Sequence, residues 1–413
     1  IIPASQISPQ ALAVLKYLPN ANGPGIANNL NASYPNNDSF NQTIDRLDQN
    51  IGDKIRLFFR YAWQNENIFT GATNPYNATT IPVQTRNWVV GYTQTITPSM
   101  VNDFRVGRQN LTTDALNYWY VNNQKDAGTQ LGIPGFNGDV KFNNPGLPAF
   151  TITGYSGITN SGTNWFQEDT TWQGTDSFTY TRGTHTIIAG AELRKLISSR
   201  AAINTPQGIF TFSGQFSGDA AADFLLGLPI SDITPGLQVR NKVAEWRDGF
   251  FIVDNWQASK KLTLNLGLRY ELPTVPYTVN GFATILNRTQ TALIPANPPQ
   301  PGFELTGPNH KDFAPRIGFA YRITDGTVLR GGYGIYYNPN QTNTFTFLSS
   351  NPPFSTTTTY NSLPTTPTLS LLNPTPSTST NGAALANVIT PNPNLPTAYM
   401  NQWSLDLERA VWR

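Results

Sequence analysis

Charged side chains at alternating positions are the residues of this sequence that could bind a polar partner. Arg56 and Arg60 lie four residues apart, and Glu192 lies two residues before Arg194. On a β-strand such spacings put side chains on one face, where they could form ion pairs with another group. The simpler alternative is that they merely keep that face wet. The complete set of candidates is Arg56, Arg60, Glu192, Arg194, Arg269, Glu271, Arg316 and Arg330.

Enzyme chemistry has little support in this sequence. There are two histidines, His185 at an expected turn and His310 in an expected loop, and there is no cysteine. Asp45 and Asp48 are three residues apart, so on a strand they point to opposite faces and make no catalytic carboxylate pair. The glycines within 331–334 lack the strand–loop–helix context of a phosphate-binding loop. We therefore expect no enzyme, no catalytic residue, no metal site and no cofactor.

Regular alternation of apolar and polar residues predicts the strands that carry the charges. In 54–64 and in 262–271 every second residue is apolar, and the residues between are mostly charged, polar or small. This is the pattern of a strand with one apolar face. The apolar set, which also includes one tryptophan near the end of the chain, is Leu57, Phe59, Tyr61, Trp63, Leu264, Leu266, Leu268, Tyr270 and Trp403.

The composition favours a membrane protein built from strands. Only 13% of the residues are charged, whereas soluble proteins average roughly 25%. Aromatic residues make up 12%, the mean hydropathy is −0.33, and no apolar run approaches the roughly 18 residues of a spanning helix. A net charge of +2 without a run of Lys or Arg gives no sign of a nucleic-acid partner.

Short and long connections alternate along the chain. Polar turns are expected near 50–53, 98–100, 182–184, 259–261 and 324–326. Longer segments are expected at about 66–85, 113–164, 200–244, 274–311 and 339–396, the last as an exposed or disordered loop rich in Pro, Thr, Ser and Asn. We count five hairpins and one last strand, eleven in all, each about 10–14 residues long. Long strands with short turns at one end and long loops at the other are typical of an outer-membrane barrel.

The cost of burying charge in lipid predicts how the strands face. A Lys or Arg on the lipid side near the bilayer midplane costs roughly 2–4 kcal/mol. The face of Arg56 and Arg60 should therefore look into the lumen, and the Leu, Phe, Tyr and Trp face into lipid. Aromatic residues near the strand ends would form the interfacial girdles.

The first part of the chain is expected to differ from the rest. Residues 1–39 should form a segment with one short helix that leads into the barrel, and 40–413 the partial barrel. Ser8 is the expected N-cap of the helix and Pro9 its first residue, with Ala11, Leu12, Leu15 and Leu18 on one face.

Several strings, in order along the whole chain, resemble the barrels of Oar-like TonB-dependent transporters. They include Ala222-Asp223-Phe224-Leu225-Leu226-Gly227-Leu228-Pro229, Leu262-Thr263-Leu264-Asn265-Leu266-Gly267-Leu268-Arg269-Tyr270-Glu271, Phe313-Ala314-Pro315-Arg316-Ile317-Gly318-Phe319, Arg330-Gly331-Gly332-Tyr333-Gly334 and Gln402-Trp403-Ser404-Leu405. The resemblance implies a 22-stranded barrel filled by a plug, located in the bacterial outer membrane. It also implies uptake of a bulky nutrient driven by the TonB system.

The chain departs from that family in showing no plug and no TonB-contacting segment. We therefore interpret it as about half of such an all-β, antiparallel up-and-down barrel, with lipid as its partner and the plug outside this chain. The nutrient could be an oligosaccharide, a peptide or a chelate. Two alternatives stay open: a plug-free outer-membrane porin, and a surface adhesion or glycan-binding β-protein whose loops do the work.

Overall fold

The computed structural model describes residues 2–25, 29–124, 126–136, 145–159, 164–201, 207–235, 239–296, 305–339, 342–355, 357–376 and 388–411. Its main feature is one large antiparallel sheet of twelve strands. Eleven of them follow one another in chain order, each paired with the next, and the short β12 (Tyr277–Thr278) pairs with β10 beside this path. The eleven are β1 (Asn36–Ile51), β2 (Ile55–Thr70), β3 (Thr79–Thr97), β4 (Met100–Asn117), β6 (Trp165–Arg182), β7 (His185–Ala201), β10 (Asn241–Trp256), β11 (Leu262–Pro273), β15 (Asp312–Thr324), β16 (Thr327–Asn338) and β18 (Ala398–Arg409).

All five expected hairpin turns are present. Gly52 and Gly183 lie in two of them with φ of +57° and +62°, a backbone conformation that glycine adopts without steric cost. The strands are longer than expected at the opposite end, where β2 extends to Thr70 and β3 starts at Thr79. The connection expected at about 66–85 is therefore only 71–78, because polar residues such as Asn65 and Glu66 continue the ladder.

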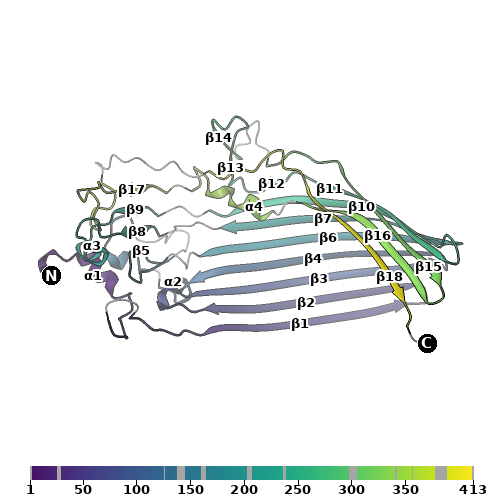
Figure 1. Cartoon of the computed structure of the whole chain (residues 1–413), viewed down its shortest axis with the longest axis horizontal. Helices are drawn as coiled ribbons and strands as arrows, with labels where there is room; N and C mark the ends of the chain where they lie inside the picture. Colours follow the sequence, from purple (N-terminus) through teal and green to yellow (C-terminus); the bar gives the residue numbers. More distant parts are fainter. Residues whose placement is uncertain are drawn as a thin grey trace.

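The sheet is open between its first and last strands among the described residues, since no pairing joins β1 to β18. Every residue of these two strands is exposed. Figure 1 shows β18 running obliquely to β1–β4, so the sheet curls along its path. The closure of a barrel and a total of 22 strands stay predictions.

One face of the sheet exposes large apolar side chains. Examples are Phe104, Leu193, Ile252 and Leu268, each more than 40% exposed within its strand. Cross-strand partners share a face, and the register links Leu193 with Asp248, Ile252 with Leu268, and Leu268 with Pro315. We call this the apolar face. A water-soluble protein rarely exposes so large an apolar surface.

The long connections and the N-terminal segment build a second body, the loop cluster, at one end of the sheet (Figure 1). Its core contains the buried Phe136, Phe150, Phe210, Phe212 and Phe224. The chain elements of the cluster come from distant parts of the sequence: α1 (Pro9–Leu15), α2 (Tyr118–Val121), α3 (Ala220–Leu226), β5 (Ala149–Ile152), β8 (Ile209–Phe212), β9 (Ser231–Ile233) and β17 (Thr359–Asn361).

The strands of this cluster form a four-stranded sheet in the order β17-β9-β8-β5. Its β5 pairs in parallel with β8, which belongs to a different connection. A second small core surrounds Val243, Phe345 and Leu348 beside β13 (Thr284–Leu286), β14 (Leu293–Pro295) and α4 (Asn343–Thr346). The 3₁₀ turns are η1 (Ala4–Gln6), η2 (Pro75–Asn77), η3 (Thr129–Leu131) and η5 (Phe347–Ser350).

Two expectations about these segments are corrected. Helix α1 starts after Ser8, whose side chain accepts a hydrogen bond from the Ala11 amide, but its buried face is Ala11 and Val14, while Leu12 and Leu15 are 48% and 40% exposed. The segment 339–396 is not simply an exposed loop, because Phe345, Leu348, Leu369 and Leu371 are buried where described. In both cases tertiary contacts with distant segments decide burial. No helix among the described residues has the length and apolar character needed to cross a membrane.

Two adjacent leucines test whether the loop cluster is a packed body. Leu371 is 1% exposed and its amide donates to the Gly227 carbonyl, whereas Leu372 is 66% exposed. Leu371→Ala should destabilise the cluster by about 2–5 kcal/mol because it leaves a cavity. Leu372→Ala should change its stability by less than about 0.5 kcal/mol. Limited proteolysis of the folded protein in detergent measures the difference, and equal cleavage rates for the two variants would contradict a packed core.

Candidate functional site

The sheet carries its ionic side chains mainly on the face opposite the apolar one. We call it the charged face. In the register, Arg56 pairs with Thr93 and Thr93 pairs with Asp103. Asp103 pairs with Ser177 of β6, and Ser177 pairs with Gly190 of β7. Gly190 lies two residues before Glu192, so Glu192 is on the same face as Arg56. All eight sequence candidates lie on this face: Arg56, Arg60, Glu192, Arg194, Arg269, Glu271, Arg316 and Arg330. The nine residues expected to face lipid lie on the other: Leu57, Phe59, Tyr61, Trp63, Leu264, Leu266, Leu268, Tyr270 and Trp403.

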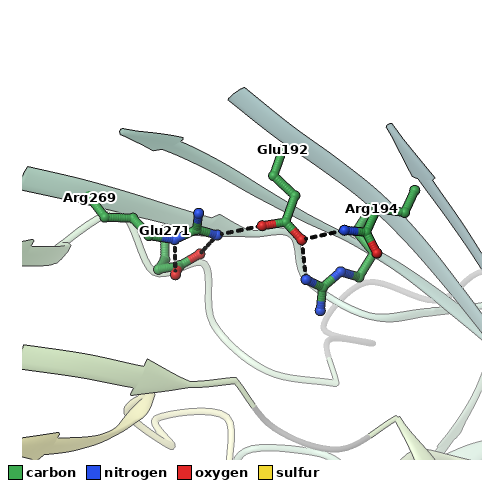
Figure 2. A network of polar contacts seen from close by, with 5 residues as sticks. Glu192, Arg194, Arg269 and Glu271 are labelled. Atoms are coloured by element: carbon green, nitrogen blue, oxygen red, sulfur yellow. Dashed lines mark hydrogen bonds and ion pairs between the residues drawn. The ribbon is translucent and has the colours of Figure 1, made fainter. Parts of the chain in front are cut away.

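Four of the eight candidates form one ionic network (Figure 2). The Arg269 guanidinium donates to both carboxylate oxygens of Glu271, at 2.5 and 3.1 Å, and to Glu192 Oε2 at 3.0 Å. Glu192 also pairs with Arg194 and accepts a hydrogen bond from Gln173 at 3.0 Å. These side chains are 14–35% exposed, so the network is partly shielded from water. Charge-assisted hydrogen bonds are stronger than neutral ones, so this network helps to hold the neighbouring strands together.

A glycine in the intervening strand makes this network possible. Gly249 of β10 lies in register between Glu192 of β7 and Glu271 of β11. A Cβ atom at Gly249 would lie 2.3 Å from Nη2 of Arg269. The missing side chain thus leaves the space through which Arg269 reaches across β10 to Glu192.

The other four candidates are dispersed. Arg316 lies over the Tyr336 ring at 4.5 Å, and Arg330 pairs with Glu408 at 3.3 Å with both side chains more than half exposed. Arg60 borders a hollow of about 490 Å³ together with Arg105. Arg56 lies near the turn end of β2 and is exposed.

Three ion pairs on the same face were not among the candidates. Glu245 pairs with Arg247 on β10, Arg46 with Asp48 on β1 at 2.7 Å, and Asp103 with Arg105 on β4 at 2.8 Å. Each pair has the two-residue spacing of Glu192 and Arg194, so the spacing alone could have found them. The start of this strand was also expected too late, since 200–244 was predicted as a loop whereas β10 begins at Asn241.

An aromatic ring on the charged face has a cationic environment. The guanidinium of Arg46 lies 4.3 Å from the Phe58 ring centroid, and that of Arg105 lies 5.9 Å from it. Such contacts between a cation and an aromatic face are attractive. Gly91 in β3 accommodates the ring, because a Cβ there would lie 2.0 Å from it.

The charged face is hollowed between β10 and β18 by a trough of about 1010 Å³. Glycines of three neighbouring strands, Gly267, Gly318 and Gly332, leave backbone exposed at its floor. Arg269 and Arg316 supply positive charge. The remaining polar lining includes Asn265, Tyr336, Gln402 and Ser404. The trough can therefore hold a polar chain or ligand against backbone and two guanidinium groups.

Outside the large sheet, one acidic group of the loop cluster is buried. Asp232 of β9 is 1% exposed, between Phe210 and Tyr360 in the register. Neither carboxylate oxygen has a hydrogen-bond partner among the described residues. Burial raises the pKa of Asp232 to about 7. The described residues include no group of three or more His, Cys, Asp or Glu able to hold a metal ion.

Comparison with known proteins identifies the family of this chain. The sequence model of a family described as "Outer membrane beta barrel domain" matches residues 1–413. The chain belongs to this family. It is therefore a protein of the bacterial outer membrane, and the apolar face and long antiparallel strands agree with that location. Comparison with curated protein sequences gave no match.

One of the solved structures to which the chain aligns shares the fold of this outer membrane barrel domain. The outer membrane transporter YddB from Escherichia coli aligns with a TM-score of 0.53 at 9% identity, over 91% of this chain and 38% of that protein. The ferripyoverdine receptor of Pseudomonas aeruginosa aligns with a TM-score of 0.44 at 10% identity, over 74% and 36%. The copper transporter OprC gives 0.45 at 9% identity, over 79% and 42%. The chain thus spans well under half the length of these transporters and receptors.

Substitution of Gly249 tests the ionic network. Gly249→Ala should push the Arg269 guanidinium away from Glu192 and destabilise the sheet by about 1.5–3 kcal/mol, the usual worth of a hydrogen bond to a charged group. Gly174→Ala is the control, because a Cβ at Gly174 of β6, on the apolar face, meets nothing within 4 Å. Urea unfolding of the protein in lipid bilayers measures both. Equal stability of the two variants would show that the bridge contributes nothing.

Asp232 predicts a pH dependence confined to the loop cluster. Its pKa is about 7 in the folded protein and about 3.8 when unfolded, so folding favours the protonated carboxyl. Stability from this group is fully present below pH 3.8 and is lost as the pH rises through about 7. Asp232→Asn should abolish this loss and slow proteolysis of the cluster at pH 8 by about tenfold or more. An unchanged pH profile of proteolysis in the variant would refute the assignment.

Proposed function

We propose that the chain is the wall of a TonB-dependent outer-membrane transporter resembling the Oar-like group. The proposal rests on one observation. The long-stranded sheet has an exposed apolar face on one side, and on the other a face with ion pairs and a large polar trough. A wall of this kind separates lipid from a polar interior. The family assignment and the fold shared with YddB support the same location.

The apolar face would contact lipid and the charged face would line the lumen. Inverting this arrangement would place the Glu192–Arg269 network in hydrocarbon, at a cost of roughly 2–4 kcal/mol for each cation near the midplane. It would also turn Leu193, Ile252 and Leu268 towards polar surroundings, so the hydrophobic term opposes inversion as well.

The lumen would be filled by a plug from sequence outside this chain. Two guanidinium groups and exposed backbone in the trough supply donors and acceptors for such a partner. The wall itself does no chemistry in this mechanism. The loops capture the substrate, the wall confines it, and the plug rearranges when the TonB system acts on it.

The edges of the sheet support a larger assembly. Among the described strands, β1 and β18 each present one unpaired edge, which hydrocarbon does not tolerate because it offers no alternative hydrogen-bond partner. We infer that further strands pair with these edges in a closed barrel of about 22 strands. The share of YddB that the chain covers, 38%, is compatible with this inference.

The loop cluster is the proposed substrate-capturing part. It lies at the end of the sheet that carries the long connections, which in outer-membrane barrels faces the exterior. Its packed core holds the surface loops in one arrangement, as a binding surface requires. We propose a bulky nutrient as the substrate, with oligosaccharide, peptide and chelate all open.

Conductance across a planar lipid bilayer distinguishes this proposal from a porin. The complete protein that contains this chain should show no stable open channel, because the plug fills the lumen, and should conduct only after the plug is removed or unfolded. A permanently open channel would favour the plug-free porin. Recovery of the protein in water without detergent would favour the adhesion or glycan-binding alternative.

Dependence on TonB is measured separately, by cross-linking in cells. The complete protein should cross-link to TonB, and it should do so more strongly when its substrate is bound. Absence of cross-linking under every growth condition that expresses the protein would contradict the transporter proposal.

A further inference from the structure

A row of alternating aromatic and cationic residues crosses five strands on the apolar face. The register pairs Trp88 with Arg108, Arg108 with Trp172, Trp172 with Lys195, and Lys195 with Trp246. We call these five residues the Trp–cation row. Their contacts confirm one surface: Arg108 lies 5.5 Å from the Trp172 ring, Lys195 lies 5.3 Å from the Trp246 ring, and the Trp88 and Trp172 ring centroids are 5.9 Å apart.

The row lies at one depth along the sheet. Trp88 is nine residues before the end of β3 at Thr97, and Lys195 is ten residues after the start of β7 at His185. Trp246 is likewise ten residues before the end of β10 at Trp256. A tilted strand crosses the hydrocarbon core in about 9–11 residues. With the turns at the periplasmic side, the row therefore lies at the outer boundary of the membrane.

More cations stand beyond the row, on the side of the loops. Lys242 and Arg240 join Arg108 around a hollow of about 620 Å³ on this face. Arg86 is on the same face, opposite Trp63 in the register. A basic surface at the headgroup level of a membrane attracts anionic lipid.

Three of the five cations named on this face form no ion pair with a described carboxylate. No described carboxylate lies within ion-pairing distance of Arg108, Lys195 or Lys242, and Nε of Arg108 is buried without a hydrogen-bond partner. The contrast with the charged face is clear, because there most guanidinium groups meet a carboxylate.

Four acidic groups of the same face lie near these cations. Glu168 borders the hollow and accepts a hydrogen bond from Asn110 at 3.1 Å. Asp176 lies four residues closer to the turn than Trp172 and accepts from Asn102 at 2.7 Å. Asp248 lies two residues closer to the turn than Trp246. Asp114 is near Arg240. None of them lies within the row.

We propose that the Trp–cation row and Lys242 bind the phosphate groups of a phosphorylated lipid of the outer leaflet. The tryptophan rings would pack against its sugars and upper acyl chains, while Arg108, Lys195 and Lys242 pair with phosphate. The row faces away from the lumen, so the bound lipid is a structural partner and not the transported nutrient. This inference rests on the proposed orientation of the wall and is independent of transport.

Native mass spectrometry of the complete protein in detergent tests the site with two probes, bis-phosphorylated lipid A and the same lipid A with both phosphates removed. The wild type should bind the phosphorylated form more tightly by about tenfold or more. The triple variant Arg108→Gln, Lys195→Gln, Lys242→Gln should lose this preference. The control triple variant Lys54→Gln, Lys260→Gln, Lys261→Gln removes equal charge at the turn end and should keep it.

Each other outcome overturns the proposal. Equal binding of both lipids by the wild type would exclude phosphate recognition. Displacement of lipid A by millimolar inorganic phosphate would assign the site to a free anion. Equal losses in both triple variants would show a general charge effect. Heat-modifiable gel mobility confirms that each variant is folded. Because the bilayer conductance is read separately, failure here leaves the transporter proposal standing.

Discussion

The separation of charge from hydrocarbon is the constraint on which this structure depends. Side chains alternate between the faces of a strand, so slipping one pairing by a single residue would exchange the faces. The slip would move Glu192, Arg194 and Arg269 to the apolar side and would place large apolar residues in the trough. Tight turns, including those at Gly52 and Gly183, help to fix the register that prevents this. The same register then determines which residues meet across strands.

Glycines shape the charged face in two ways, and the register determines where each occurs. Gly249 leaves room for Arg269 to cross its strand, and Gly91 leaves room for the Phe58 ring between two guanidinium groups. In the trough, Gly267, Gly318 and Gly332 do the opposite and leave space open. The charged face is thus crowded where ions pair and hollow where a partner can lie. The absence of a side chain is used for packing in one place and for access in the other.

Local sequence patterns predicted much of the sheet. The alternation of apolar and polar residues in a strand, and the polar residues of a short turn, can both be recognised within about a dozen residues. The hairpin turns and the segregation of Arg56 from Leu57, or of Arg269 from Leu268, could be stated from sequence alone. Strand β10 was foreseen less well. Its outer half carries charged or aromatic residues on both faces, with Lys242 and Trp246 on one and Glu245 and Arg247 on the other, so the alternation is weak.

Features that depend on contacts between distant segments were not foreseen. The core of the loop cluster unites Val14, Phe150, Phe210 and Leu371, which come from four separate segments. The Trp–cation row is invisible along the chain, since each member lies on a different strand and only the register aligns them. Asp232 gives no sign of burial in a sequence, because its environment comes from β8 and β17.

The central claim is that one face of the sheet meets lipid and the other does not. The chain has no cysteine, so single cysteines can be introduced and spin-labelled one at a time along β11, from Leu262 to Glu271. Two collision rates report the surroundings of each label in a bilayer. One is with oxygen, which concentrates in lipid, and the other is with a water-soluble nickel chelate. We expect a period of two, with oxygen favoured at Leu264, Leu266 and Leu268. A profile without alternation, or one with the nickel chelate favoured at these leucines, would contradict it.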